Sequence, residues 1–283
     1  MLPVPLAFAL ALVTVKPPFI GVAAADQLVS RHACILDARG NSDFKKGHLP
    51  GAVRIDWEDF RDGWGRTGRL ADDDARLEDK LSALGVADDR PVLVYGAGAA
   101  GWGEEGRVDW MLSYLGHKEV RILDGGLAAW REAGRPIATG AMEAPARGHF
   151  TIRRQASERA ELKDVVRSLG DGKTLLLDAR TRAEWNGATP YFEARGGHIP
   201  GARSLEWKTL VSPSGMVRPA HELAGLLTAV GAHPDTPIIV YCTGGVRSAF
   251  AWAVLRSLGY RDIRNFDGSF WLWAGHKELP VDQ

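Results

Sequence analysis

The chain has few cysteines and no excess charge of either sign. Its 283 residues include only two cysteines, Cys34 and Cys242, too few for a disulfide framework or a thiolate metal cage. Lysine plus arginine number 35 and aspartate plus glutamate number 35, so the formal net charge is zero. A neutral chain lacks the basic field that attracts nucleic acids or anionic membranes. We therefore expect no nucleic-acid partner, no membrane partner and no metal site.

Long apolar runs are also rare, and the longest lies at the N-terminus. Residues 2–15 are rich in Leu, Ala and Val, too short to span a bilayer but of a length typical of a signal-peptide core. No Lys or Arg precedes this run, and the alanines before Asp26 equally fit the start of a first helix over residues 24–31. Residues 1–18 are thus a possible signal peptide, and both a cytoplasmic and an exported location stay open.

The most informative segment surrounds Cys242. A short apolar run, residues 237–241, leads into the cysteine, and residues 248–259 form a helical pattern that ends in glycine. This pattern predicts a buried strand, a loop and a helix. A thiol between strand and helix lies at the positive end of the helix dipole, where its thiolate is stabilised. Most free cysteines are small buried hydrophobes, but Gly244, Gly245 and Arg247 favour a loop that holds an anionic sulfur.

The sequence repeats itself. Four motifs of the first half recur in the same order in the second: 35–39 with 176–180, 47–52 with 197–202, 91–95 with 237–241, and 115–130 with 258–273. Ordered matches of this kind indicate duplicated domains. Residues 139–149, rich in Gly, Ala and Pro, predict a linker. We therefore expect one domain over residues 19–138 and a second over residues 150–283.

Each half alternates short apolar strands with helical patterns, which predicts an α/β fold with parallel strands and helices on both faces of the sheet. In such sheets reactive groups gather beyond the carboxyl ends of the strands. The repeat also provides a comparison between the halves, because Gly96 takes the place of Cys242 in the first half and no arginine follows at the matching position. Only the second half can carry thiol chemistry, and we expect the first half to wall the site.

These motifs together resemble those of two-domain rhodanese-type sulfurtransferases: Asp-Ala-Arg, Gly-His-(Leu/Ile)-Pro-Gly-Ala, the strand before Cys242, and the segment from Leu115 to Trp130. The resemblance covers the chain from about Phe19 to its end. It implies two tandem rhodanese-like domains, the first inactive and the second catalytic. It also implies transfer of a sulfane sulfur through a cysteine persulfide, from thiosulfate or 3-mercaptopyruvate to cyanide or a thiol. We expect no cofactor, a small-molecule donor and acceptor, and a monomer.

The resemblance and the loop chemistry assign roles to the residues around the cysteine. Cys242 is the predicted nucleophile. The predicted persulfide-binding loop consists of Thr243, Gly244, Gly245, Val246, Arg247 and Ser248, whose amides and hydroxyls can donate to a terminal anionic sulfur. Arg247 is expected to lower the thiol pKa or to lock the loop. Asp178 and Arg180 are expected either to order this loop or to form a purely structural ion pair.

The loop departs from the family's patterns. The thiosulfate-type loop carries Arg and Lys after the cysteine and the mercaptopyruvate-type loop carries Gly-Ser-Gly-Val-Thr, whereas this chain has Thr-Gly-Gly-Val-Arg. The position of the family's substrate arginine is Glu184 here, which we expect to repel an anionic donor. Arg195 or Arg182 is the predicted replacement for substrate binding, with Arg203 as a further candidate and an exposed, solvated side chain as the alternative.

Alternative functions stay open at this stage. A thiosulfate sulfurtransferase is the first hypothesis, and a 3-mercaptopyruvate sulfurtransferase or a persulfide carrier for a protein partner are the alternatives. A cysteine phosphatase is disfavoured, because related phosphatases place five residues between Cys and Arg and this loop has four. The shorter loop suits a single sulfur atom better than a tetrahedral phosphate.

Overall fold

A computed structural model describes residues 17–63 and 65–283. The apolar run at residues 2–15, with its open signal-peptide role, lies outside the described residues. The first half contains β1 (Phe19–Ile20), α1 (Val22–Ser30), β2 (Cys34–Asp37), α2 (Asn41–Lys46), β3 (Val53–Arg54), the 3₁₀ helix η1 (Trp57–Phe60), α3 (Asp74–Ala83), β4 (Val92–Tyr95), η2 (Gly98–Ala100), α4 (Glu104–Tyr114), β5 (Val120–Leu123) and α5 (Gly126–Glu132). The second contains η3 (Ala156–Glu158), α6 (Leu162–Ser168), β6 (Leu175–Asp178), α7 (Arg182–Trp185), β7 (Arg203–Ser204), η4 (Trp207–Leu210), α8 (Ala220–Ala229), β8 (Ile238–Tyr241), α9 (Val246–Ser257), β9 (Ile263–Asn265) and α10 (Ser269–Gly275).

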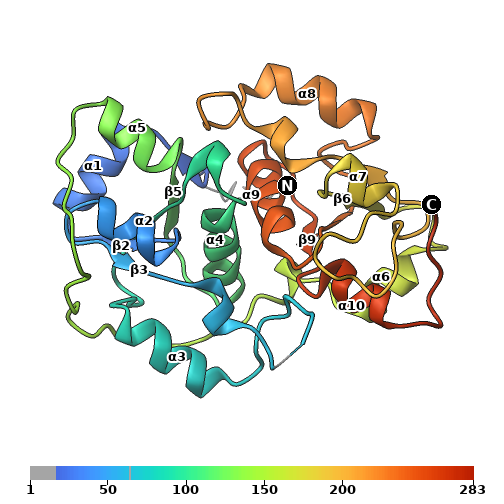
Figure 1. Ribbon diagram of the computed structural model, residues 1–283, viewed down its shortest axis with the longest axis horizontal. Helices are drawn as coiled ribbons and strands as arrows, with labels where there is room; N and C mark the ends of the chain where they lie inside the picture. Colours follow the sequence, from blue (N-terminus) through green and yellow to red (C-terminus); the bar gives the residue numbers. More distant parts are fainter. Residues whose placement is uncertain (1–16, 64) are drawn as a thin grey trace, which may run out of the picture.

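Each half is built on a parallel sheet, as Figure 1 shows. The strand order is β1-β5-β4-β2-β3 in the first sheet and β7-β6-β8-β9 in the second. The order of the four repeated strands is the same, and β1 is the additional edge strand of the first sheet. The prediction of an α/β fold with two parallel sheets is confirmed, because the same sequence motifs build the same strand order twice.

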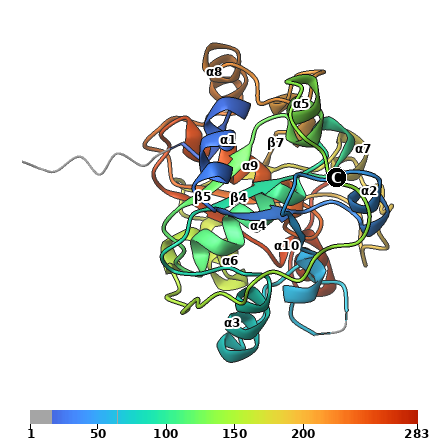
Figure 2. The ribbon, with the colours of Figure 1, turned by 90° about the vertical axis from the view of Figure 1, so that its left-hand side faces the viewer.

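Alternating residues of each strand face different helices. In β4, Leu93 and Tyr95 pack with α1 and α5, whereas Val92 and Val94 belong to a core that also includes α3 and α4. Figure 2 shows α1 and α5 above the strands of the first sheet and α3 below them. Because both faces are covered, β4 and β8, which lie inside the two sheets, are apolar throughout, as is typical of buried parallel strands.

The two halves meet along α4 and α9, which lie side by side at the centre of the molecule in Figure 1. Gly106 allows this close approach, since a Cβ there would lie 2.4 Å from the Cα of Phe250. Every residue of α9 from Val246 to Leu255 is buried, and the largest apolar core extends through both halves. The start of α9, where Cys242 lies, is therefore held between the two halves.

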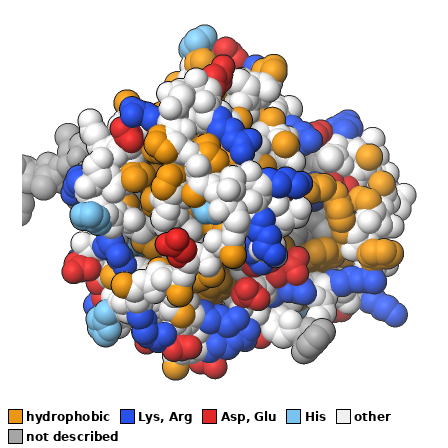
Figure 3. All heavy atoms as spheres, turned by 60° about the vertical axis from the view of Figure 1, so that its left-hand side comes forward, with side chains coloured by type: hydrophobic (Ala, Val, Ile, Leu, Met, Phe, Trp, Pro, Cys, Tyr) orange, Lys and Arg blue, Asp and Glu red, His pale blue; other side chains and the backbone are white. Residues whose placement is uncertain are grey.

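Charged side chains are distributed over the surface with both signs mixed. On the face shown in Figure 3, lysine and arginine alternate with aspartate and glutamate. Among residues 17–63 and 65–283, no helix is long and apolar enough to cross a membrane.

Candidate active site

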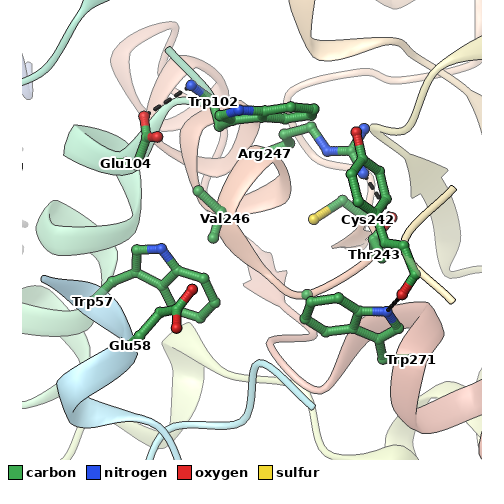
Figure 4. Close-up of a pocket in the computed structure, with 11 residues that line it drawn as sticks. Trp57, Glu58, Trp102, Glu104, Cys242, Thr243, Val246, Arg247 and Trp271 are labelled. Carbon is green, nitrogen blue, oxygen red and sulfur yellow. Dashed lines mark hydrogen bonds between the residues drawn. The ribbon is translucent and has the colours of Figure 1, made fainter. Parts of the chain in front are cut away.

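Cys242 lies at the carboxyl end of β8, between the central strand and α9. The loop turns through Gly245, whose φ of 78° is the left-handed conformation that glycine adopts without strain. This turn directs the Gly245 N–H at the cysteine, with 3.1 Å between the nitrogen and Sγ. Figure 4 shows the sulfur pointing into a pocket rather than into the core.

The surroundings of Cys242 favour its thiolate. Burial alone would oppose ionisation of the thiol, but the charge of Arg247 and hydrogen bonds from Ser248 and the Gly244 amide outweigh it and lower the pKa of Cys242. The Ser248 hydroxyl lies 3.6 Å from Sγ. The start of α9 adds the positive end of its dipole. The loop is thus arranged to stabilise negative charge on sulfur.

The other cysteine is also buried, but the shift of its pKa is opposite. Cys34 is buried in β2, and its Sγ lies 3.4 Å from the carbonyl oxygen of Leu84. Burial raises the pKa of Cys34 to about 11. It is a packing residue without thiolate character at neutral pH.

The structure corrects the expectation that Glu184 repels an anionic sulfur donor, because Glu184 does not line the pocket in front of Cys242. Its carboxylate is buried and accepts two hydrogen bonds from Arg247, at 2.7 and 2.8 Å. Burial favours the protonated acid, yet the bond and charge of Arg247 dominate and hold the pKa of Glu184 at about 2. Glu184 therefore locks Arg247 in place and balances its charge.

The two loop hydroxyls have different partners. Thr243 donates to Glu184 at 2.6 Å and accepts a hydrogen bond from Arg247, so its hydroxyl is not directed at sulfur as we had expected. Ser248 lies 2.7 Å from the Asn265 amide oxygen and also within reach of Sγ. The Ser248 hydroxyl has one hydrogen for these two acceptors, and the bond to Asn265 is the shorter one. Of the two loop hydroxyls, that of Ser248 is the one that lies near Sγ.

The structure does not bring the predicted substrate arginines to the pocket. Arg195 is occupied by the carbonyl oxygens of Trp273, Ala274, His276 and Leu279. Arg182 and Arg203 line a separate depression near α7 and β7. The substrate-binding roles expected for these arginines are therefore corrected: Arg195 ties the C-terminal segment to the insertion before residue 197, and the others lie elsewhere.

Asp178 and Arg180 form a buried pair at the end of β6. Their closest atoms are 2.6 Å apart, and Arg180 also donates to the Gly197 carbonyl oxygen. Asp37, Arg39 and Gly47 form the same arrangement in the first half. Because the first half, which has Gly96 in place of Cys242, keeps this pair, the geometry favours the structural alternative, in which the pair ties a strand to the following turn.

The first half supports the loop from behind. Gly68 packs directly on the catalytic loop, since a Cβ at this position would lie 1.8 Å from the Gly244 carbonyl oxygen. Arg107 donates to the carbonyl oxygens of Gly68 and Gly245, at 2.5 and 3.3 Å. The backbone of Leu70 also donates to Asp267 of the second half. These contacts fix the loop conformation.

In front of Cys242 lies a cavity of about 290 Å³ to which both halves contribute. Besides the loop, its lining residues are Trp57, Glu58, Trp102 and Glu104 from the first half and Tyr191 and Trp271 from the second. None of these six residues was predicted from the sequence. The sequence signal available for them was the abundance of tryptophan, but a tryptophan in a sequence can equally line a pocket or lie in the core.

The matching loop of the first half cannot hold a thiol in the same place. Gly96 occupies the position of Cys242, and a Cβ there would lie 1.9 Å from Glu105 Oε2. Burial raises the pKa of Glu105 to about 8. A carboxyl group thus fills the space in which the second half places its sulfur.

The fold and this loop define a class of proteins: paired parallel-sheet domains with one cysteine in a cradle of amides. The family model for the rhodanese-like domain matches residues 22–133 and 161–276. The chain belongs to the rhodanese family, with two rhodanese-like domains in tandem.

Relatives match most of the chain. The sulfur carrier protein TtuD of Thermus thermophilus is 33% identical over 249 residues, covering 84% of this chain and 86% of the relative. The thiosulfate sulfurtransferase of Corynebacterium glutamicum is 36% identical, covering 83% of this chain and 80% of the relative. The crystal structure of SseA from Escherichia coli, described with 3-mercaptopyruvate sulfotransferases, has a TM-score of 0.79 at 29% identity and covers 90% of this chain and 99% of that one.

Proposed function

We propose that this protein is a sulfurtransferase that carries a sulfane sulfur as a persulfide on Cys242. The observation that supports this most is the loop geometry: the Gly245 amide contacts Sγ, and Arg247, separated from the cysteine by four residues, has its charge fixed by Glu184. Such a cradle stabilises negative charge on the first sulfur and on a second one attached to it.

Thiosulfate is the proposed donor. The Cys242 thiolate attacks the sulfane sulfur, a new S–S bond forms, and the S–S bond of thiosulfate breaks with its electron pair leaving on sulfite. The persulfide then carries the negative charge on its outer sulfur. Cyanide or a thiolate attacks that sulfur in the second step, and the electron pair of the broken bond returns to Cys242.

Two observations about relatives bear on the alternatives. TtuD is named a sulfur carrier protein, which supports transfer to a protein partner. SseA is described with 3-mercaptopyruvate enzymes, which supports a different donor. The pocket accommodates small molecules, so we propose small-molecule exchange first, by a monomer whose catalytic domain comprises residues 150–283.

Thiocyanate formation from thiosulfate and cyanide tests the proposal. Cys242→Ser is expected to abolish the reaction, whereas Cys34→Ser is expected to leave it unchanged, because only Cys242 has a lowered pKa and faces the pocket. Activity that survives in Cys242→Ser would exclude the proposed mechanism. Loading by thiosulfate without turnover to cyanide or thiols would favour the carrier instead.

A further inference from the structure

Beyond the loop that holds the sulfur, the pocket in front of Cys242 has carboxylates and aromatic side chains in its lining, which favour a cationic group. We propose that the sulfur acceptor is a thiol that carries a cationic ammonium group, held between tryptophan side chains and the carboxylates of Glu104 and Glu58. This inference rests on the proposed function and names the substrate class of its second step.

Arg247 is the cation that lines the pocket, and its charge is already balanced. Both of its terminal nitrogens bond to the Glu184 carboxylate. Its guanidinium carbon also lies 5.3 Å from the ring centre of Trp102 and 5.6 Å from that of Tyr191. Arg247 can therefore stabilise the cysteine sulfur, but it presents little unbalanced charge to the rest of the pocket.

The pocket contains a carboxylate without a counter-ion among the described residues. Glu104, the first residue of α4, accepts a hydrogen bond from the Trp102 amide at 2.8 Å, and no ion pair within 4.0 Å is formed by it there. Burial raises the pKa of Glu104, as expected of a half-buried acid that no cation stabilises. Glu58 is more exposed and has Arg61 at 4.0 Å. The free negative charge of the pocket thus exceeds its free positive charge.

The duplication places Glu104 at the first position of α4, next to the position that matches the arginine of the other half. Glu104 follows the left-handed N-cap Gly103 as Val246 follows the left-handed N-cap Gly245, one residue before Arg247. The two helices α4 and α9 pack side by side, so their first turns face the same pocket. The inactive half therefore contributes an acid of opposite sign to the pocket of the active half.

Aromatic side chains form the remaining walls. Figure 4 shows Trp102 on one side of the Cys242 sulfur, Trp57 beside Glu58 on another, and Trp271 on a third. Trp102 remains 45% exposed, although its ring meets Tyr191 edge-on with 5.5 Å between the ring centres. Aromatic faces, above all those of tryptophan, attract cations, most strongly where the contact is shielded from water. The walls and the acids thus favour the same ligand charge.

The cavity is also larger than an inorganic donor requires. Its volume of about 290 Å³ corresponds to roughly ten water molecules at about 30 Å³ each. A five-atom oxyanion leaves much of that space empty, whereas a short organic thiol with an ammonium group fills it. The cavity therefore has room for the thiol with an ammonium group that Glu104 and Glu58 favour.

The transfer step balances as a thiol exchange. The acceptor thiolate attacks the outer sulfur of the Cys242 persulfide and forms a new S–S bond. The bond between Sγ and the outer sulfur breaks, its electron pair returns to Sγ, and the acceptor leaves as its own persulfide. The ammonium group does not react; it positions the acceptor.

Three probe thiols of similar size test the inference: cysteamine, 2-mercaptoethanol and mercaptoacetate, which are cationic, neutral and anionic. Protein loaded with thiosulfate is mixed with each at pH 8, and the loss of the persulfide is followed by mass spectrometry. Because the thiols differ in intrinsic reactivity, each rate is divided by that for 2-mercaptoethanol with the same variant. Glu104→Gln keeps an oxygen that can accept the hydrogen bond from the Trp102 backbone N–H. Glu58→Gln is combined with it in the double variant.

The cysteamine ratio is expected to fall about fivefold in Glu104→Gln, because a partly exposed charge contact is worth up to about 1 kcal/mol. It is expected to fall about tenfold in the double variant, since Glu58 already has Arg61 at 4.0 Å and contributes less. The mercaptoacetate ratio is expected to rise. Glu132→Gln, a change of equal charge at the end of α5 and outside the pocket, should leave both ratios unchanged.

Ratios that stay within twofold of wild type in the double variant overturn the inference, as does a wild-type preference for mercaptoacetate. Failure of the proposed function has a different signature, since the wild-type protein would then gain no sulfur from thiosulfate at all. If wild-type protein gains sulfur from thiosulfate normally but the acceptor ratios do not depend on charge, the cationic acceptor is refuted while the proposed function stands.

Discussion

Replacement of Glu184 by glutamine tests how the catalytic loop is held. Glu184 accepts two bonds from Arg247 and one from Thr243, and all three side chains are buried. Glutamine has the same shape but no charge, so the buried guanidinium loses its counter-ion. Breaking a buried pair from one side costs about 3 to 5 kcal/mol.

The pKa of Glu184 gives an independent magnitude. Its value of about 2, against 4.5 for an ordinary glutamate, corresponds to about 3 kcal/mol at about 1.4 kcal/mol per pH unit. Since the folded-state pKa is depressed, this stability is present above pH 4.5 and is lost as the pH falls toward 2. The free energy of unfolding should thus be about 3 kcal/mol lower in Glu184→Gln at pH 7, and the two proteins should converge in acid.

Urea unfolding at pH 7, 5, 4 and 3, followed by tryptophan fluorescence, measures the difference directly. Glu132→Gln is the matched control and should change stability by less than about 0.5 kcal/mol. The unpaired Arg247 should also lower the pKa of Cys242 further, which the pH dependence of alkylation by iodoacetamide reports. An equal free energy of unfolding at pH 7 for wild type and Glu184→Gln would refute the role assigned to the pair.

Three further changes probe the loop and its surroundings. Ser248→Ala removes a hydroxyl near Sγ and should raise the pKa of Cys242, which shifts the alkylation profile to higher pH; an unshifted profile contradicts this role. Gly68→Ala places a Cβ against the Gly244 carbonyl and should lower kcat for thiocyanate formation more than tenfold, whereas wild-type kcat would show that the loop tolerates displacement. Arg195→Ala removes the side-chain donor of four carbonyls, of which those of Trp273 and His276 keep a backbone N–H partner, and should lower the melting temperature while KM for thiosulfate stays constant. A large rise in KM would instead restore Arg195 as a substrate residue.

The fold was predictable because its signals are local and occur twice. Apolar runs of four or five residues mark buried strands, and the repeated turn motifs fix which strands correspond. The position of Cys242 between strand and helix follows from the same local pattern. The structure moves the start of that helix by two residues, from Ser248 to Val246, within the usual uncertainty of a helix boundary.

The partners of the loop were less predictable, because they depend on which side chains turn toward each other. Glu184 was interpreted only from its position, which is that of the family's substrate arginine, and its negative charge suggested that it repels an anionic sulfur donor. One local signal pointed elsewhere: Thr181 and Glu184 form a capping box at the start of α7, which fixes the carboxylate near that helix start. Its contact with Arg247 spans 63 residues of sequence, and no periodicity reveals such a pairing.

The pocket walls were not predictable at all. Trp57 and Trp102 approach Cys242 only because the two halves pack along α4 and α9. Their distance in sequence from the cysteine carries no information about this packing. A sequence can therefore indicate the nucleophile while the residues that select its substrate emerge from the tertiary structure.

The sulfur-bearing role of Cys242 is tested most directly by the mass of the protein after incubation with thiosulfate and removal of the excess. We expect a gain of one sulfur atom on the peptide that contains Cys242, loss of that sulfur upon addition of cyanide, and the same behaviour in Cys34→Ser. A gain located on Cys34, or an equal gain in Cys242→Ser, would show that Cys242 does not carry the persulfide.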